Sequence, residues 1–318
     1  MRGARSARTR GKLERRSPSV SCTARLSDVR AYLRSLLRKW CSALDKARRF
    51  WKIRHVPLRT LRRWRLCEPE LKLVDVLLDG EPGLCLDIGA HVGEYCYVLE
   101  GCVAAAQVHA FEPNPKSCVR LRALFPNIHV WNVALSDEIG SAPFKIPSID
   151  GSPYPTRGTL EAFAEPGESG SEVTQVRTTT LDAFSEQLGG GPVSFLKVDV
   201  EGHERKVLAG GMEMIEAHRP IMLVEIEQRH HEEAISEIFR EIEGLGYSGC
   251  FLDLNEGRFA SVDRFDAAKM QRYDDLKSAG YVNNFIFVPN SRAPRVLQRL
   301  EKTVAEAFVG PMSVASTP

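Results

Sequence analysis

The sequence predicts an α/β protein built on a doubly wound, mostly parallel sheet. Short apolar runs that are typical of buried strands occupy 84–88, 108–111 and 129–133, and helix-like segments occupy 92–99 and 116–124. This alternation indicates consecutive βαβ units, in which each helix connects two parallel strands. With 318 residues, 43% of them hydrophobic and 26% charged, the chain has the composition of a globular protein with one main domain.

The first strand ends in a glycine turn. Asp87 lies at the end of the apolar run, and Gly89 and Gly93 follow it before the next helix. Gly89 has no Cβ, so a ligand can lie against the backbone there, and the N–H groups at a helix start favour an anion. The spacing G-x-x-x-G is not the G-x-G-x-x-G of dinucleotide-binding folds, and no Gly-Lys-Ser/Thr of a P-loop follows.

The second strand indicates the class of ligand. It ends in Glu112, which lies 25 positions after Asp87. An acid at this place, roughly 20 residues past the glycine turn, is positioned to bind a ribose diol. A pyrophosphate usually requires more glycine than this turn has. S-adenosylmethionine requires only a seat for its amino acid part, with Asp87 on the ammonium and the helix start on the carboxylate, so we predict it as the cofactor.

The stretch after the third strand contains candidates for both ligands. Ser136 and Asp137 follow that strand near the expected place of an adenine, although a simple turn is the alternative. Residues 150–170 are rich in Gly and Pro and predict a lid or binding loop, in which Tyr154 or Arg157 would touch the methyl acceptor. The flanking runs, 142–146 and 173–179, are expected to pair as a small antiparallel insertion.

The fourth strand, starting at Val193, contains the candidate catalytic residues. Lys197, Asp199 and Glu201 face the same way by the strand period of two, and their charges indicate the carboxyl end, where ligands bind in open α/β sheets. Methyl transfer to a hydroxyl requires a group that removes its proton. Our candidates are Asp199, then Glu201 and His203. The alternatives are a structural Asp199–Lys197 pair, a helix-capping Glu201 and an exposed His203 at the start of a helix over 203–216.

A divalent metal is not required by this pattern. Asp199, Glu201 and Glu225 are hard oxygen ligands of the kind that Mg²⁺ prefers. Nothing in their spacing demands an ion, and we predict none.

The rest of the chain predicts the far edge of the sheet and two extensions. A strand over 221–226 and a helix over 231–245 precede two strands, 247–252 and 284–288, expected as an antiparallel pair at the sheet edge. The predicted domains are a basic N-terminal extension (1–66), the main domain (67–290), and a basic helix and tail (291–318).

The N-terminal extension differs in charge from the remainder. Residues 1–66 contain 21 Lys and Arg and only Glu14, Asp28 and Asp45 as acids, a net +18, while the whole chain has +2. Residues 28–51 show an amphipathic helical pattern that would suit peripheral contact with an anionic membrane. A solvated extension is the plainer alternative, and we expect no nucleic-acid binding. Eight scattered Cys without a C-x-x-C pair predict a reduced chain. Because the sequence has neither a signal-peptide pattern nor an 18-residue apolar run, we predict a cytoplasmic protein, whose N-terminal extension is the candidate for peripheral contact at the inner membrane face.

Several motifs together resemble the FkbM family of S-adenosylmethionine-dependent methyltransferases. They are Asp87-Ile-Gly-Ala-His-Val-Gly93, Phe111-Glu-Pro-Asn114, Asn132-Val-Ala-Leu-Ser-Asp137, Thr179-Thr-Leu-Asp182, Leu196-Lys-Val-Asp-Val-Glu-Gly202 with Glu204, and Val224-Glu225. The resemblance extends over roughly 68–289 and departs at His91, where the family often has asparagine.

The resemblance implies a class I methyltransferase sheet, Rossmann-like and of seven strands, with an antiparallel edge. It implies O-methylation of a hydroxyl on a sugar, glycan or secondary metabolite. The implied cofactor contacts are Asp87, Gly89, Ala90, Gly93, Glu112, Asn114, Ser136 and Asp137. The rival hypotheses are a catalytically silent cofactor-binding protein of the same fold and an NAD-dependent oxidoreductase, which the glycine turn disfavours.

Overall fold

The computed structural model describes residues 68–188, 191–272 and 280–309, together with Lys46, Phe50 and Ile53. All of them belong to one compact unit that begins at Lys46. The predicted amphipathic helix at 28–51 and the boundary at residue 67 therefore fall largely outside the described residues.

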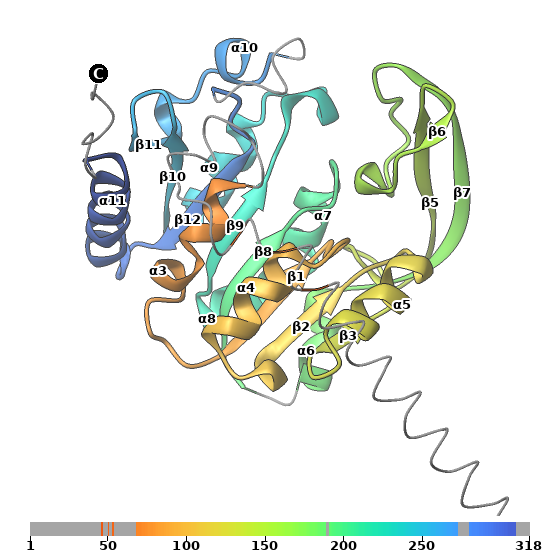
Figure 1. The fold of residues 1–318 in the computed structure, drawn as a ribbon, viewed down its shortest axis with the longest axis horizontal. Coiled ribbons are helices and arrows are strands. Elements are labelled where there is room, and N and C mark those ends of the chain that lie inside the picture. Colours follow the sequence, from red (N-terminus) through yellow and green to blue (C-terminus); the bar gives the residue numbers. More distant parts are fainter. Residues whose placement is uncertain are drawn as a thin grey trace, which may run out of the picture. The chain divides into compact units, whose positions relative to one another are not determined.

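The main sheet has eight strands among the described residues, in the order β11-β10-β12-β9-β8-β1-β2-β3 (Figure 1). Their bounds are β1 Leu84–Ile88, β2 Val108–Phe111, β3 His129–Trp131, β8 Val193–Val198, β9 Ile221–Glu225, β10 Tyr247–Asp253, β11 Arg258–Ser261 and β12 Asn284–Pro289. The strands from β9 to β3 pair in parallel, and β12 and β11 are antiparallel to their neighbours. The predicted doubly wound, mostly parallel sheet is confirmed.

Two details of the predicted sheet change. The sheet has eight strands rather than seven, because the four-residue β11 adds to the edge beside β10. Only one of its residues, Phe259, is buried, so the segment has no apolar run that would predict a strand. The predicted antiparallel pairing of β10 and β12 is confirmed, but β12 lies inside the sheet between β10 and β9, so only β10 and β11 form the edge.

Helices cover both faces of the sheet. One face packs against α3 Val74–Leu78, α4 Glu94–Cys102, α5 Pro115–Leu124 and α11 Ala293–Val309. The other packs against α6 Leu181–Ser185, α7 Glu204–Ala209, α8 Met212–His218 and α9 Ser236–Gly244. The short α10 spans Ala267–Met270, and η1 spans Pro69–Lys72. Phe50 and Ile53, which precede the predicted boundary at residue 67, are buried in the first of these two cores.

The single helix predicted over 203–216 is wrong, because the chain forms α7 and α8 with a break at Gly210 and Gly211. A Cβ on Gly210 would lie 2.0 Å from the carbonyl oxygen of Ser136. The close approach of the segment after β4 (Ala134–Leu135) therefore requires a glycine at the break.

A second, smaller sheet stands apart from the main one (Figure 1). Its strands are β4 Ala134–Leu135, β5 Gly140–Ile149, β6 Ser152–Pro153 and β7 Glu168–Thr179, in the order β4-β7-β5-β6. We call residues 140–179 the arm. The predicted antiparallel insertion is confirmed and is longer than expected, since β5 and β7 pair over almost their whole length. A small core of Ala134, Phe144, Ile146 and Val176 holds the arm's base together.

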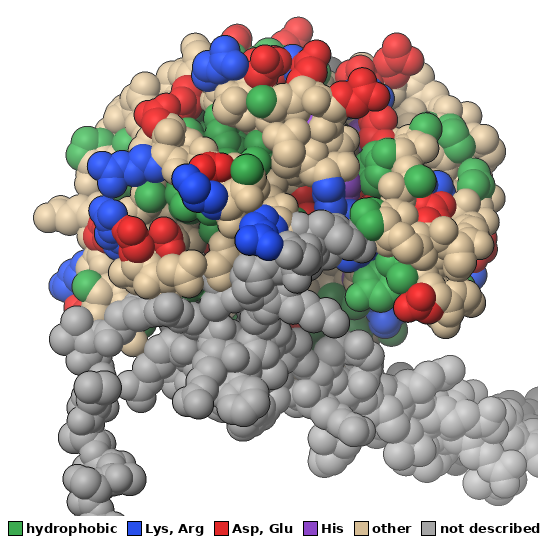
Figure 2. All heavy atoms as spheres, turned by 90° about the horizontal axis from the view of Figure 1, so that it is seen from above, with side chains coloured by type: hydrophobic (Ala, Val, Ile, Leu, Met, Phe, Trp, Pro, Cys, Tyr) green, Lys and Arg blue, Asp and Glu red, His purple; other side chains and the backbone are tan. Residues whose placement is uncertain are grey.

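The surface of the described residues is mixed. Acidic side chains gather along the upper edge of the face in Figure 2, and hydrophobic ones are visible at its right-hand side. Exposed hydrophobic residues on or next to the arm are Ile139, Tyr154 and Val173. No helix of the described residues is long and apolar enough to cross a membrane.

Candidate active site

A cavity of about 290 Å³ opens at the carboxyl ends of β1, β2, β8 and β9, beside the arm. Seven predicted site residues line it: Asp87, Gly89, Ala90, Glu112, Asp199, Glu201 and His203. Four others do not: Gly93, Asn114, Ser136 and Asp137. The main sheet thus brings together acids that are far apart in sequence, at the edge where open α/β sheets bind their ligands.

Asp87 is a buried acid at the floor of the cavity. It lies in β1 beside Ala110 of β2 and Lys197 of β8. Its side chain is 2% exposed, and its Oδ2 accepts a hydrogen bond of 3.1 Å from the thiol of Cys96. Burial raises its pKa to about 6, although the Cys96 hydrogen bond and Lys197 act in the opposite direction. A cationic group that enters the cavity would stabilise the ionised form of this carboxyl.

The two glycines of the turn have different neighbours. Gly89 has φ +85°, and a Cβ there would lie 1.7 Å from the carbonyl oxygen of Asp199. Contact with the loop after β8, rather than with a ligand, therefore explains why residue 89 has to be a glycine. Gly93 has φ +86°, and its Cβ would lie 2.5 Å from Cε2 of Phe125. Gly93 packs against Phe125 and does not line the cavity, and its contact with the cofactor stays a prediction.

Glu112 is held by backbone donors at the end of β2. Its Oε2 accepts from the N–H of His91 at 2.8 Å, and its Oε1 accepts from the N–H of Asn114 at 2.7 Å. Burial raises its pKa to about 7, while these two hydrogen bonds act to lower it. The Asn114 side chain caps α5 by accepting from the N–H of Lys116 at 2.9 Å. Asn114 thus orients Glu112 through its backbone.

Apolar residues line the wall where we predicted an adenine. Val133, Ala134 and Leu135 line the cavity, and they directly precede the two residues that we selected, Ser136 and Asp137. The adenine contact of Ser136 and Asp137 stays a prediction. The apolar wall was missed because a Val-Ala-Leu run after a strand is indistinguishable in sequence from core packing.

Lys197 is a buried cation between two carboxyl groups of the cavity, those of Asp199 and Glu225. It is 0% exposed, its Nζ lies 3.8 Å from both Asp199 and Glu225, and it donates to Oδ1 of Asn284 at 3.1 Å. Burial raises the pKa of both carboxyl groups, and Lys197 opposes that rise. The pairing of Asp199 with Lys197, considered from sequence as an alternative to catalysis, is present, and Asp199 lines the cavity as well. Both roles are therefore open to Asp199.

Glu201 connects the cavity wall to other elements. It has φ +51°, its carboxylate lies 3.2 Å from Arg229, and its backbone carbonyl accepts from Oγ1 of Thr159 at 2.7 Å. The helix-capping role that sequence reasoning considered for Glu201 is not present, because His203 is the N-cap of α7 and no side chain caps that end. Glu204, the first residue of α7, instead accepts from the N–H of Gly202 at 2.9 Å in the preceding loop.

His203 is buried rather than exposed. Its Nδ1 lies 2.6 Å from Oε1 of Glu161 and its Nε2 lies 2.9 Å from Oγ of Ser136. The hydrogen bond from His203, together with Lys206, lowers the pKa of Glu161 to about 2 against the effect of burial, so Glu161 is a carboxylate. Nδ1 of His203 therefore donates to Glu161. Glu161 was missed because it comes from an irregular loop 42 residues away.

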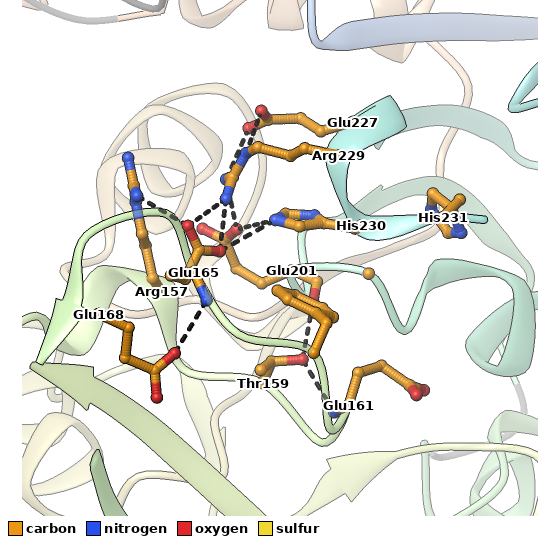
Figure 3. Close-up of polar contacts among 12 residues, drawn as sticks. Arg157, Thr159, Glu161, Glu165, Glu168, Glu201, Glu227, Arg229, His230 and His231 are labelled. Atoms are coloured by element: carbon orange, nitrogen blue, oxygen red, sulfur yellow. Dashed lines mark hydrogen bonds and ion pairs between the residues drawn. The ribbon is translucent and has the colours of Figure 1, made fainter. Parts of the chain in front are cut away.

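A polar cluster fastens the arm to the main domain (Figure 3). We define the Arg229 cluster as Arg157, Glu165, Glu201, Glu227, Arg229 and His230. Nε of Arg229 donates to Glu227 at 2.7 Å, and Nη1 of Arg229 binds Glu165 on the arm. Nη1 of Arg157 donates to the same Glu165 at 2.8 Å.

The arm contributes a different set of residues to the cavity than we expected. Arg157 lies over the ring of Tyr154 and binds Glu165, and neither Arg157 nor Tyr154 lines the cavity. The lining residues of the arm are Phe144, Pro155, Thr156, Gly158, Thr159 and Leu160. The prediction that the 150–170 stretch borders the site thus identified the segment but not the side chains.

Two groups of side chains have ligand atoms within 4.8 Å of one another, as a metal site would require. They are Glu68 with Asp199 and Glu225, and Glu165 with Glu201 and His230. The set considered from sequence is thus divided between them. Lys197 lies beside the first group and Arg229 binds the second, so a protein cation already faces each. The absence of a metal stays a prediction.

Comparison with known proteins identifies the family. The family model described as the methyltransferase FkbM domain matches residues 87–248, just over half of the chain. The match begins at Asp87 and includes Glu112, Asp199 and His203. The chain belongs to the FkbM methyltransferase family.

Individual relatives align with only part of their length. The 2-O-methyltransferase NoeI of Sinorhizobium fredii is 27% identical over 169 residues, which are 49% of this chain and 68% of that protein. The hexuronic acid methyltransferase AglP of Haloferax volcanii is 30% identical over 151 residues, 46% of this chain and 59% of that protein. The crystal structure of Methyltransferase FkbM from Methylobacillus flagellatus KT superposes with a TM-score of 0.40 at 14% identity, covering 64% of this chain and 43% of that one.

Proposed function

We propose that the protein is an S-adenosylmethionine-dependent methyltransferase that methylates a hydroxyl group of a sugar. The observation that carries the proposal is the placement of Asp87 and Glu112 at adjacent strand ends in a cavity that Asp199 also lines. The family supports methyl transfer. The name of NoeI, a 2-O-methyltransferase, supports transfer to an oxygen, and the name of AglP, a hexuronic acid methyltransferase, supports a sugar as the acceptor.

The residues of the cavity fit the proposed methyl donor. Asp87 is a buried carboxyl that suits the ammonium group, and Glu112 is held with its oxygens oriented by two backbone N–H groups, which suits a ribose diol. Val133, Ala134 and Leu135 supply an apolar wall for a base. S-adenosylmethionine supplies an activated methyl group when bound, so the protein itself has to align the acceptor oxygen and take its proton.

We assign Asp199 as the general base that removes the proton of the acceptor hydroxyl. Its side chain is 29% exposed beside the buried Lys197, and burial raises its pKa toward the range in which a general base is effective. Both ring nitrogens of His203 are occupied by Glu161 and Ser136, which favours a positioning role for His203.

The test is calorimetric titration with S-adenosylhomocysteine. We expect micromolar binding by the wild type and loss of at least tenfold in affinity in Asp87→Asn and in Glu112→Gln. The matched control is Glu256→Gln, the same change in an exposed acid that pairs with Arg258 outside the cavity lining. A folded wild type without affinity would refute the donor, and binding of NADH in its place would favour the oxidoreductase. Methyl transfer from labelled donor to a sugar would separate an enzyme from a silent binder.

A further inference from the structure

The cavity lining is rich in carboxyl groups and has no basic side chain of Lys or Arg among the described residues, which restricts the acceptor. Seven carboxyl groups line it: Glu68, Asp87, Glu94, Glu112, Asp199, Glu201 and Glu225. Within the described part of the chain no Lys or Arg lines it. We propose that the acceptor is a sugar without negative charge, and that the cavity discriminates against sugars bearing a carboxylate, sulfate or phosphate beside the reacting hydroxyl. This inference rests on the proposed function and specifies its substrate class.

Three basic groups beside the cavity lining are already paired with carboxyl groups. Lys197 is 0% exposed beneath the wall and faces Asp199 and Glu225 at 3.8 Å each. The guanidinium of Arg229 binds three carboxylates of its cluster, and that of Arg157 binds Glu165. An anionic group of the acceptor would have to break these pairs to reach any of these three cations. Breaking a buried pair leaves an uncompensated charge, which is strongly unfavourable.

Histidine does not supply the missing positive charge. His91 lines the cavity, but burial lowers its pKa to about 4, with Arg120 acting in the same direction, so it is neutral near pH 7. His203 also lines the cavity, and its Nδ1 already faces the carboxylate of Glu161 at 2.6 Å. An anionic acceptor would therefore be desolvated without a partner.

The acceptor side of the cavity suits an uncharged polyol. We assign Asp87 and Glu112 to the donor, which leaves Asp199, Glu201 and Glu225 on the β8 and β9 side. The arm faces the same cavity with residues that have no charge: Phe144, Pro155, Thr156, Gly158, Thr159 and Leu160. Carboxyl groups form hydrogen bonds with sugar hydroxyls in either protonation state, and a protonated amine would gain a charge interaction with an ionised one.

The proposed acceptor of this chain differs from that of one named relative. AglP is a hexuronic acid methyltransferase by name, so its acceptor bears a carboxylate. An identity of 30% over 151 residues leaves room for different side chains around the acceptor. The prediction is therefore that family membership does not transfer the uronic acid specificity.

The experiment compares three acceptors that share one aglycone: p-nitrophenyl glucoside, glucosaminide and glucuronide. Methyl transfer from labelled S-adenosylmethionine is measured with the full chain, and binding of each glycoside to protein saturated with S-adenosylhomocysteine is measured by saturation-transfer NMR. We expect kcat/KM for the glucoside and the glucosaminide to exceed that for the glucuronide at least tenfold, with the same order in binding.

A variant of the arm tests the physical cause. Thr156 lines the cavity from an exposed position on η3 (Pro155–Arg157). Thr156→Arg introduces the missing cation and should reduce the preference for the glucoside over the glucuronide at least threefold. Thr156→Gln adds length without charge and should leave the preference unchanged.

The outcomes separate the inference from the function on which it rests. Equal or better use of the glucuronide would overturn the charge argument while leaving methyl transfer in place. Failure of all three glycosides to bind or react, with S-adenosylhomocysteine still bound, would overturn both this inference and the sugar acceptor but retain the donor. Loss of S-adenosylhomocysteine binding itself would refute the donor assignment.

Discussion

At the scale of single residues, the donor end of the cavity depends on two carboxyl groups that burial holds partly protonated. Burial raises the pKa of Asp87 from 3.8 to about 6 and that of Glu112 from 4.5 to about 7. Both pKa values lie above those of the unfolded chain. Their contribution to stability is therefore fully present at low pH and is lost as the pH rises through the folded values.

Donor binding should consequently tighten as the pH rises. An ammonium group favours ionised Asp87, so binding of S-adenosylhomocysteine releases protons between about pH 5.5 and 8. We expect its Kd to fall severalfold across this range. Titrations at one pH in buffers of different ionisation enthalpy measure the protons released. A Kd that does not change with pH, with no proton release, would show that these carboxyl groups do not contact the ligand.

The assignment of the base leads to a second prediction. Asp199→Asn removes the proton acceptor but keeps the shape of the side chain, so kcat should fall at least about 100-fold. His203→Gln retains a donor toward Glu161 and should cost at most about tenfold. Binding of S-adenosylhomocysteine should stay within threefold of wild type in both variants. A larger loss in His203→Gln than in Asp199→Asn would transfer the role of base to the histidine.

The sequence predicted the residues of this site unevenly, for a physical reason. Asp87, Glu112 and Asp199 directly follow or end apolar strands, and parallel strands align their carboxyl ends. Glu68 and Glu161 reach the site from irregular segments, where no periodicity indicates the direction of a side chain. Contacts such as Glu161 with His203 depend on the fold of the whole arm.

At the scale of secondary structure elements, tight backbone contacts at glycines position the loops around the cavity. Gly89 places the loop after β1 against the carbonyl of Asp199, and Gly210 places the α7–α8 break against the carbonyl of Ser136. Strand positions were predictable because each buried strand is a short apolar run. The division of α7 from α8 was not, because a glycine pair inside a helical pattern has several explanations.

The Gly210 contact can be tested by adding one methyl group. Gly210→Ala would place Cβ 2.0 Å from the Ser136 carbonyl oxygen, so the backbone must shift, and we expect a loss of about 2 kcal/mol or more in the free energy of unfolding. Gly101→Ala is the control: it lies inside α4 with nothing within 4 Å of its Cβ. There alanine should stabilise by up to about 1 kcal/mol. Urea unfolding measures both, and equal effects would contradict the role of the contact.

At the scale of the whole described domain, the arm and the main sheet close the cavity from opposite sides. Their connection includes Glu165 of the arm and Arg229 beyond β9, with Arg157 and His230 on the same carboxylate. Phe163 of the arm also stacks on His230 with ring centroids 4.6 Å apart. The sequence indicated a loop near the site but could not show this connection, because its partners lie 64 residues apart and follow no pattern.

The ion pairs between the arm and the main sheet should be lost at low pH. Burial acts to raise the pKa of Glu165, but His230, Arg229 and Arg157 hold it at about 2. Since this lies below the unfolded value of 4.5, the stabilisation is present above about pH 4.5 and is lost as the pH falls toward 2. Near neutral pH the cluster is intact, so the arm should then hold its residues against the cavity.

Removing the central cation should therefore loosen the arm without removing the donor site. In Arg229→Met we expect faster hydrogen exchange over residues 154–167, and an acceptor KM at least tenfold higher, because the arm contributes six lining residues to the cavity. Affinity for S-adenosylhomocysteine should stay within threefold, since Asp87 and Glu112 belong to the main sheet.

Arg205→Met is the matched control, because Arg205 pairs with Glu233 and Glu241 in exposed positions. Glu165→Gln, which breaks the same pairs from the arm, should reproduce the effect. Unchanged exchange in both Arg229→Met and Glu165→Gln would mean that packing alone, through Phe163 and the arm's small core, holds the arm in place.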